Sequence, residues 1–285
     1  YNICKMEVFN LKNRLLERVS HLRTKAQEVT SDVLLLDFTI VNAFLIGDPF
    51  TDRKDYILVD TGLENSYDFI IHSAERRFGK GTKPNAIVLT HGHFDHVGSV
   101  VKLAEEWDVP VYVHPLELPY LTGEKDYPLA NPEVGGGKVA EMSQSFPHTS
   151  IDISNRVYPL PEDGSIPDMP AWKWIHTPGH TKGHISLYRE MDRVLIAGDA
   201  LSTTKQESLL AILTQKEQMS GPPAYMTEDW NAAKESLLKL KALDPHIIAP
   251  SHGKPIRGRD ARESLDNLIR NFDKLIRENL DTMER

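Results

Sequence analysis

The chain has 285 residues, a formal net charge of −8, a pI of about 5.8 and one cysteine, Cys4. This length suits one large α/β domain or two small ones, and the acidic balance excludes a general nucleic-acid-binding protein, which needs a basic surface. One cysteine excludes an intrachain disulfide and a thiolate metal site, so we expect a reducing, cytoplasmic setting and nitrogen or oxygen ligands for any metal. No apolar run is long enough to span a membrane and no signal peptide is recognisable, so no membrane association is expected.

The N-terminal part is expected to form a helical extension. Residues 8–29 place apolar side chains at roughly helical spacing among lysines, arginines and glutamates. We therefore assign residues 1–30 to this extension and residues 31–285 to a single domain. The helix would pack on the domain or contribute to a homodimer.

The apolar period then becomes that of strands alternating with helices. In the first half, strands are predicted at residues 33–36, 41–46, 56–59, 86–89 and 111–113, with helices at 65–78 and 98–107. In the second half, strands are predicted at 156–160, 172–176, 184–188, 194–197 and 247–249, with helices at 227–243 and 259–278. Because the pattern occurs in both halves, it predicts two layers of strands that share one core, with helices outside.

Residues 115–155 interrupt this pattern. They contain five prolines and the run Gly135–Gly137, and the segment is too long for a simple connection. We predict an irregular excursion that covers a functional site and helps to select a substrate.

Histidines and aspartates gather at four predicted strand ends. The densest stretch is residues 91–96, with three histidines and one aspartate directly after the strand at 86–89. Together the four strand ends supply seven candidate metal ligands: His91, His93, Asp95, His96, His180, Asp199 and His252. This set is too large for one tetrahedral zinc ion, and it suits two adjacent metals with one aspartate bridging them.

Two adjacent divalent ions would activate water for hydrolysis. Zinc is the first choice, and iron or manganese would accept the same ligands. Such ions lower the pKa of bound water towards about 7, and Asp95 could orient the hydroxide and move a proton to the leaving group. Asp60, at the end of the strand at 56–59, could hydrogen-bond a ligand imidazole or could form a local turn. The remaining histidines are assigned structural roles: His21, His72, His114, His148, His176, His184 and His246. Of these, His176, His184 and His246 lie close to the motifs and could instead support the ligands.

The spacing His91-x-His93-x-Asp95-His96, followed by His180, Asp199 and His252, resembles the metallo-β-lactamase-fold hydrolase superfamily. Asp60 within residues 58–62 and the run at 177–181 also match, and the resemblance covers about residues 40–256. It implies an αββα sandwich of two mixed sheets with helices on the outer faces and the metals at one edge. It further implies a division of the ligands: one metal takes His91, His93 and His180, the other takes Asp95, His96 and His252, and Asp199 bridges.

Several subtypes of that superfamily fit the sequence poorly. Diiron flavoproteins carry glutamate where this chain has His93, and a common type of lactonase carries tyrosine where it has Ser202. Ribonuclease Z would need a basic arm, which the net charge of −8 does not favour. The second glyoxalases place glutathione-binding residues after the bridging aspartate, and residues 200–204 lack that pattern.

We therefore expect a hydrolase that uses a metal-bridging hydroxide to cleave a small ester, thioester or lactone. The alternatives are a mononuclear iron enzyme resembling the persulfide dioxygenases, a phosphodiester or β-lactam hydrolase of the same fold, and a non-catalytic sensor. The partner would be a small-molecule substrate. Its contacts are expected from residues 115–155 and 201–226, where five side chains offer apolar surface: Tyr120, Tyr127, Phe146, Met219 and Tyr225. The alternative is that the same side chains pack the excursion onto the domain.

Overall fold

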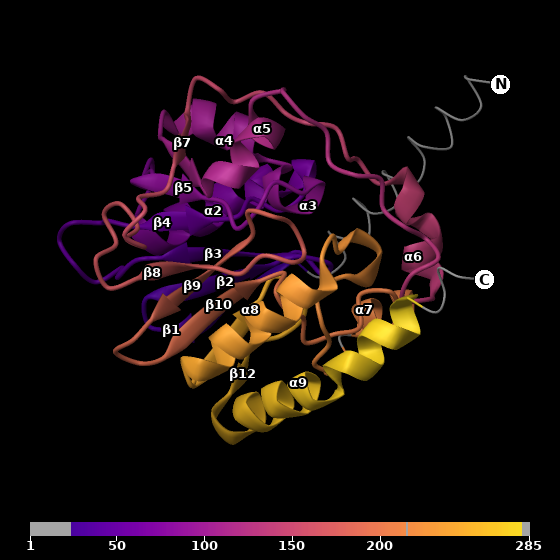
Figure 1. Ribbon diagram of the computed structural model, residues 1–285. Coiled ribbons are helices and arrows are strands. Elements are labelled where there is room, and N and C mark those ends of the chain that lie inside the picture. The colour runs from indigo at the N-terminus through magenta and orange to yellow at the C-terminus, as the bar shows by residue number, and fades with distance from the viewer. Residues whose placement is uncertain (1–23, 215, 281–285) are drawn as a thin grey trace.

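The computed structural model describes residues 24–214 and 216–280, which form two β-sheets packed face to face between helices (Figure 1). The first sheet has the order β1 (Lys25–Thr30), β2 (Val33–Asp37), β3 (Asn42–Ile46), β4 (Ile57–Val59), β5 (Ala86–Val88), β6 (Val111–Val113), β7 (Val157–Pro159). The second has the order β12 (Ile256–Arg257), β11 (Ile247–Pro250), β10 (Val194–Gly198), β9 (Ile185–Arg189), β8 (Lys173–His176).

Both sheets are mixed. In the first, β1 to β4 pair antiparallel and β4 to β7 pair parallel. In the second, only β10 and β11 pair parallel. The parallel pairs require crossover connections, and the helices that make them lie on the outer faces. The predicted αββα sandwich is confirmed.

The strands are buried on both faces because each sheet packs against helices on one side and against the other sheet on the other. On β2, Val33 and Leu35 contribute to the core between the sheets, and Leu34 and Leu36 contribute to the core beneath the helices. Alternate residues of a strand point to opposite faces, so an almost continuous apolar run fills two cores at once.

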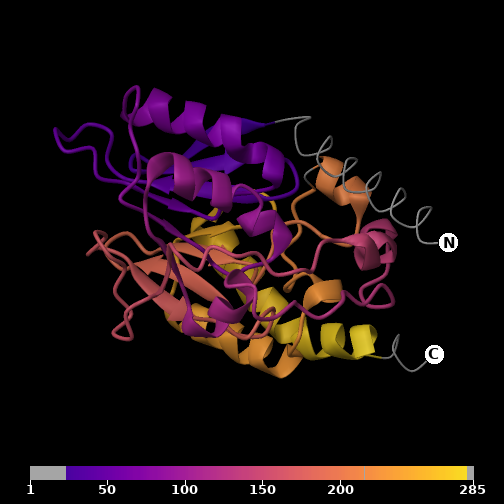
Figure 2. The same ribbon diagram turned by 90° about the horizontal axis from the view of Figure 1, so that it is seen from above.

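Long helices cover each outer face. α2 (Tyr67–Phe78) and α4 (Val100–Trp107) pack on the first sheet, and α8 (Trp230–Ala242) and α9 (Gly258–Leu280) pack on the second (Figure 2). Shorter elements make up the connections: η1 (Glu64–Ser66), α3 (Phe94–Val97), η2 (Pro115–Glu117), α5 (Leu118–Leu121), α6 (Lys138–Met142), η3 (Ser143–Ser145), α7 (Leu209–Thr214) and η4 (Ala224–Met226). Side chains of α3, α6, α7 and η4 share one small apolar cluster at one end of the sandwich (Figure 1).

The helix predicted for residues 8–29 is wrong over its last part. Lys25–Thr30 form β1, which pairs antiparallel with β2, so the first hairpin crosses the boundary that we placed at residue 30. The side chains from Lys25 to Glu28 are exposed on this edge strand, and an edge strand of that kind has little apolar alternation for a sequence pattern to detect. Residues 8–23 of the predicted helix lie outside the described residues.

The other connections follow the expected outline. The predicted terminal helix at 259–278 is present as α9, and residues 115–155 are irregular apart from short turns of helix. None of the described helices combines the length and the apolar content needed to cross a bilayer.

Candidate metal centre

The stretch at residues 91–96 lies at the end of β5 and leads into α3. His91 and His93 come before the helix, and Asp95 and His96 lie within it. The His96 carbonyl accepts hydrogen bonds from Thr61 N and Thr61 Oγ1, both at 2.7 Å. The turn after β4 therefore fixes the C-terminal end of α3, and with it the position of His96.

The structure brings all seven predicted ligands together at one edge between the sheets. Three groups have ligand atoms that lie within 4.8 Å of one another: His91 with His93 and His180, His91 with His96 and Asp199, and Asp95 with His96 and His252. The first and third groups are the two sets that the family resemblance implies. Six of the seven residues are buried, and the Asp95 side chain is 16% exposed.

The first group consists of three neutral imidazoles. His93 Nδ1 lies 3.0 Å from His91 Nε2 and 2.9 Å from His180 Nε2. Burial, reinforced by the neighbouring histidines, lowers the pKa of His91 and of His93 well below the ordinary value. Burial also lowers the pKa of His180, to about 3. All three rings therefore keep free lone pairs at neutral pH, as a metal ligand requires.

The second group places two imidazoles beside a carboxylate. His96 Nε2 and His252 Nε2 lie 3.8 and 3.7 Å from the Asp95 carboxylate. Burial by itself would lower the pKa of His96, but Asp199, Asp60 and Asp95 outweigh it and raise that pKa well above the ordinary value. The pKa of His252 is raised despite burial, chiefly by Asp199.

Asp199 lies between the two groups. Its Oδ2 atom is 3.3 Å from His180 Nε2 and 3.1 Å from His252 Nε2, and its Oδ1 atom is 3.5 Å from His96 Nε2. Burial would raise the pKa of Asp199, but His252 and His96 hold it well below the ordinary value, so the side chain is a carboxylate.

Outer hydrogen bonds fix the orientation of several rings. His96 Nδ1 donates to Asp60 Oδ2 at 2.8 Å, and His252 Nδ1 donates to the Ile40 carbonyl at 2.6 Å. Of the two interpretations of Asp60, the structure therefore has the bond to an imidazole. His184, which we assigned a structural role, accepts a hydrogen bond from Asp199 N at 2.8 Å. Such bonds settle which ring nitrogen carries the proton and which faces the centre.

The donor set fits a divalent metal. His96 Nε2 and Asp199 Oδ1 are buried and make no hydrogen bond with any described residue, a costly arrangement for polar atoms without a ligand. Imidazole nitrogens and carboxylate oxygens accept zinc, iron and manganese, so the chemistry of the site leaves the metal open.

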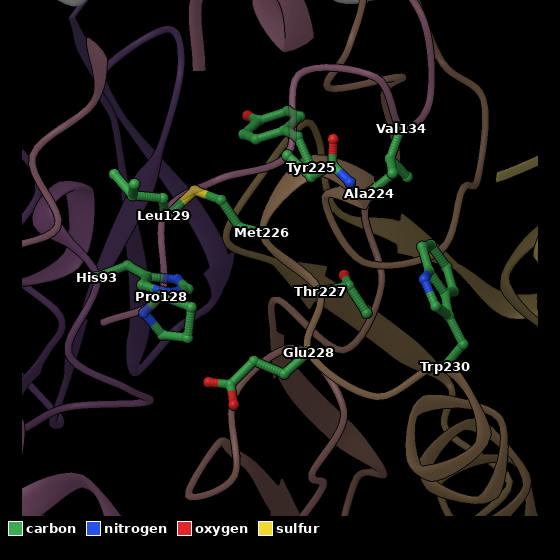
Figure 3. Close-up of a pocket in the computed structure, with 11 residues that line it drawn as sticks. His93, Pro128, Leu129, Val134, Ala224, Tyr225, Met226, Thr227, Glu228 and Trp230 are labelled. Atoms are coloured by element: carbon green, nitrogen blue, oxygen red, sulfur yellow. The ribbon is translucent and has the colours of Figure 1, made fainter. Parts of the chain in front are cut away.

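A small cavity of about 100 Å³ opens beside His93. Figure 3 shows His93, Pro128 and Leu129 on one side and Ala224, Thr227 and Trp230 on the other. Val134, Ala224 and Tyr225 form buried walls, and Pro128, Leu129 and Glu228 are exposed at the rim.

The predicted apolar contact residues divide into three kinds. Tyr225 lines the cavity. Phe146 packs against Tyr225 with ring centroids 5.9 Å apart, and Tyr120 stacks on Tyr127, whose ring lies 4.5 Å from that of His93. Met219 instead packs against the core beneath α8 and α9 and does not line this cavity.

Sequence reasoning missed one buried residue beside the centre, Glu117. Its carboxylate accepts hydrogen bonds from Gly92 N at 3.1 Å and from Gly183 N at 2.9 Å. Glu117 lies at the end of a short helical turn in the irregular excursion, and no local pattern distinguishes it from an exposed glutamate.

The comparison with known proteins agrees with this fold. Residues 36–252 match the model of the Metallo-beta-lactamase superfamily. The probable metallo-hydrolase YflN of Bacillus subtilis (strain 168) is 47% identical over 241 residues, which cover 85% of this chain and 91% of that protein. The probable metallo-hydrolase YybB of the same organism is 34% identical, covering 72% of this chain and 79% of that protein.

Two solved structures are also similar. The B3 metallo-beta-lactamase BLEG-1 is 25% identical with a TM-score of 0.53, covering 78% of this chain and 90% of that one. TTHA1623, in a di-iron-bound form, is 26% identical with a TM-score of 0.50, covering 83% of this chain and 94% of that one. The chain belongs to the metallo-β-lactamase superfamily of metallo-hydrolases, whose fold implies binding of divalent metal.

Proposed function

We propose that this protein is a dinuclear metal-dependent hydrolase of small esters, thioesters or lactones. The observation that carries the proposal is the position of Asp199, whose two carboxylate oxygens lie within 3.5 Å of ring nitrogens from both ligand groups. A carboxylate in this position suits a bridge between two ions roughly 3.5–4 Å apart.

The two groups would each hold one ion. His91, His93 and His180 would bind the first, and Asp95, His96 and His252 the second, with Asp199 shared. When bound, such a pair supplies a hydroxide at neutral pH and polarises the carbonyl oxygen of a substrate.

Asp95 is the residue we assign to proton transfer. Its carboxylate is the most accessible among the seven ligands, and burial raises its pKa above the ordinary value for aspartate. A carboxyl group with a raised pKa can accept a proton from water and return it to a leaving group. Its Oδ1 and Oδ2 atoms, which face His96 and His252, are the atoms that would carry this proton.

The cavity beside His93 favours a compact, uncharged acyl group. Its walls are mostly apolar, with Asn131 and Thr227 also lining it, and the Glu228 carboxylate at the rim would repel an anionic substituent. The volume of about 100 Å³ leaves room for a short chain or a small ring, and the rest of a larger substrate would extend past Leu129 into solvent.

The test couples metal analysis to a substrate panel on one preparation. We expect two divalent ions per chain and turnover of neutral short-chain esters, thioesters or lactones in preference to anionic ones. His93→Ala should abolish turnover while the protein stays folded, and Asp95→Asn should lower kcat by about 100- to 10,000-fold if Asp95 transfers a proton. One iron per chain with oxygen uptake would refute hydrolysis and favour the dioxygenase alternative.

A β-lactam hydrolase is the second candidate, because BLEG-1 is described as a metallo-beta-lactamase and is 25% identical to this chain. Penicillin and cephalosporin substrates therefore belong in the panel. Turnover of these compounds faster than that of the esters would replace the first proposal with this one.

A further inference from the structure

Glu117 joins the two loops that carry the first ligand group. Its Oε1 atom accepts hydrogen bonds from Thr181 Oγ1 at 2.7 Å and Gly183 N at 2.9 Å. Its Oε2 atom accepts from Gly92 N at 3.1 Å and from the Tyr127 hydroxyl. One carboxylate thus receives four donors from three segments of the chain.

Two of the four donors are immediate neighbours of the three ligands. Gly92 lies between His91 and His93 in the loop after β5 of the first sheet, and Thr181 follows His180 in the loop between β8 and β9 of the second. Glu117 therefore connects the two sheets at the point where the three imidazoles converge.

The packing around this carboxylate is tight. A Cβ atom on Gly92 would lie 2.6 Å from the Tyr127 hydroxyl, and one on Gly183 would lie 2.6 Å from Glu117 Cγ. Glu117 itself has no exposed surface and does not line the cavity. It cannot reach a substrate, so any effect on the reaction must act through the ligands that it positions.

The other ligand group depends on different supports. Asp60 orients His96, the Ile40 carbonyl orients His252, and His184 contacts the main chain of Asp199. None of these contacts involves Glu117 among the hydrogen bonds of the described residues. Asp199 is common to both groups, but the hydrogen bonds of Glu117 reach only the loops of the first group.

We propose that Glu117 is a positioning residue that fixes the loops of His91, His93 and His180 and so sets the metal affinity of that half of the centre. This inference rests on the metal-binding part of the proposed function and adds a residue to it. Substitutions of groups that hold metal ligands in place typically weaken metal binding by about 10- to 100-fold, which is the size of effect expected here.

Glu117→Gln is the informative substitution because the amide keeps the shape and changes one acceptor into a donor. The Tyr127 and Thr181 hydroxyls can rotate to accept from an NH₂ group, but the Gly92 and Gly183 main-chain N–H groups can only donate. Gly92 N also donates to the Tyr127 hydroxyl at 2.9 Å, so the amide oxygen should face Gly183 N and the NH₂ group should face Gly92 N. The NH₂ group then replaces the acceptor 3.1 Å from Gly92 N, and the loop of His91 and His93 loses its hydrogen bond to Glu117.

The experiment measures Zn²⁺ affinity of metal-stripped protein by competition with a chromophoric chelator, in two parent variants. His252→Ala leaves the first group intact, and His93→Ala leaves the second. We expect Glu117→Gln to weaken zinc binding by about 10- to 100-fold in the His252→Ala parent and by less than about twofold in the His93→Ala parent.

Two further variants serve as a control and as a milder substitution. Glu207→Gln alters another buried glutamate, whose Oε1 accepts from Ala224 N at 3.0 Å, and should change zinc affinity in neither parent. Tyr127→Phe removes one of the four donors to Glu117 and should weaken zinc binding by a smaller factor, again only in the His252→Ala parent. It keeps the test decisive if Glu117→Gln does not fold.

The outcomes separate the two proposals. Equal losses in both parents would show a general structural effect and overturn the positioning role, as would no loss in either. If the unmutated protein binds no zinc, iron or manganese, the metal centre itself is refuted, and the role of Glu117 with it. If it binds two ions and the Glu117 variants bind them equally well, only the role of Glu117 is refuted.

Discussion

The carboxylate of Asp60 determines which nitrogen of His96 can bind a metal, and Asp60→Asn tests this. Asp60 has a φ of 57°, a left-handed conformation that asparagine also adopts, so the backbone should be preserved. Asp60 Oδ1 accepts from Thr90 N at 2.8 Å, and Oδ2 lies 2.8 Å from both Thr90 Oγ1 and His96 Nδ1. In asparagine, one of these two acceptor oxygens is kept and the other is replaced by an NH₂ group, which donates.

The expected structural consequence follows from the donors. Thr90 N can only donate, so the asparagine oxygen should face it and the NH₂ group should face His96. His96 Nδ1 must then accept, which moves the ring proton to Nε2, the atom that lies 3.5 Å from Asp199 Oδ1. A protonated Nε2 has no lone pair for a metal.

We expect Asp60→Asn to weaken Zn²⁺ binding at the second group by about 10- to 100-fold, or about 1.4 to 2.8 kcal/mol. Loss of the carboxylate also lowers the pKa of His96 and so reduces competition by protons, an opposite effect that is smallest at alkaline pH. The titration should therefore be made at alkaline pH in the His93→Ala parent, where only the second group remains.

Asp32→Asn is the matched control, because Asp32 pairs with Arg189 and contacts none of the seven ligands. The zinc affinity of the Asp32→Asn variant should equal that of the His93→Ala parent. An Asp60→Asn affinity within about twofold of the parent would refute the argument that Asp60 sets the protonation of His96.

Three other results are expected. Asp199→Ala should lower the occupancy of both metals, measured by elemental analysis, and loss of only one ion would contradict a bridging role. Acidification should release the metal of the His96 and His252 group first. The pKa of each of these two histidines is raised, so protons compete with the metal there at higher pH than at His180, whose pKa is about 3. Simultaneous release of both metals during a pH titration would contradict this. Leu237→Ala, in the core beneath α8 and α9, should lower the free energy of unfolding by about 2–5 kcal/mol in urea without changing metal content, and a loss below about 1 kcal/mol would contradict tight packing there.

Much of the fold follows from local patterns in the sequence. Short, almost continuous apolar runs predict the central strands, because these strands are buried between a helix layer and the opposite sheet. The long helices α2, α8 and α9 have continuous apolar faces and are predicted close to their observed bounds. The sequence pattern does not predict β1, because most of its side chains are exposed at the sheet edge. Hydrogen bonds to β2 define this strand, and hydrophobicity does not.

The metal ligands, too, are predicted partly by local sequence patterns and partly only by the packing of distant segments. Polar residues directly after buried strands, in Gly-containing turns, already single out His91, His180, Asp199 and His252 as candidates, because strand ends converge at one edge of a sheet. The sequence spacing by itself does not pair His180 with the first group or His252 with the second. That pairing depends on how the second sheet packs against the first.

By itself, then, the sequence determined the layers, the edge that carries the site and the residue types that gather there. Only the tertiary structure decided that Asp199 lies between two groups of ligands and that Glu117, 25 residues after Gly92 and 66 before Gly183, receives hydrogen bonds from both ligand loops. The physical reason is that a buried carboxylate must accept hydrogen bonds, so its role depends on which donors surround it. These donors come from distant segments that meet only when the two sheets pack together.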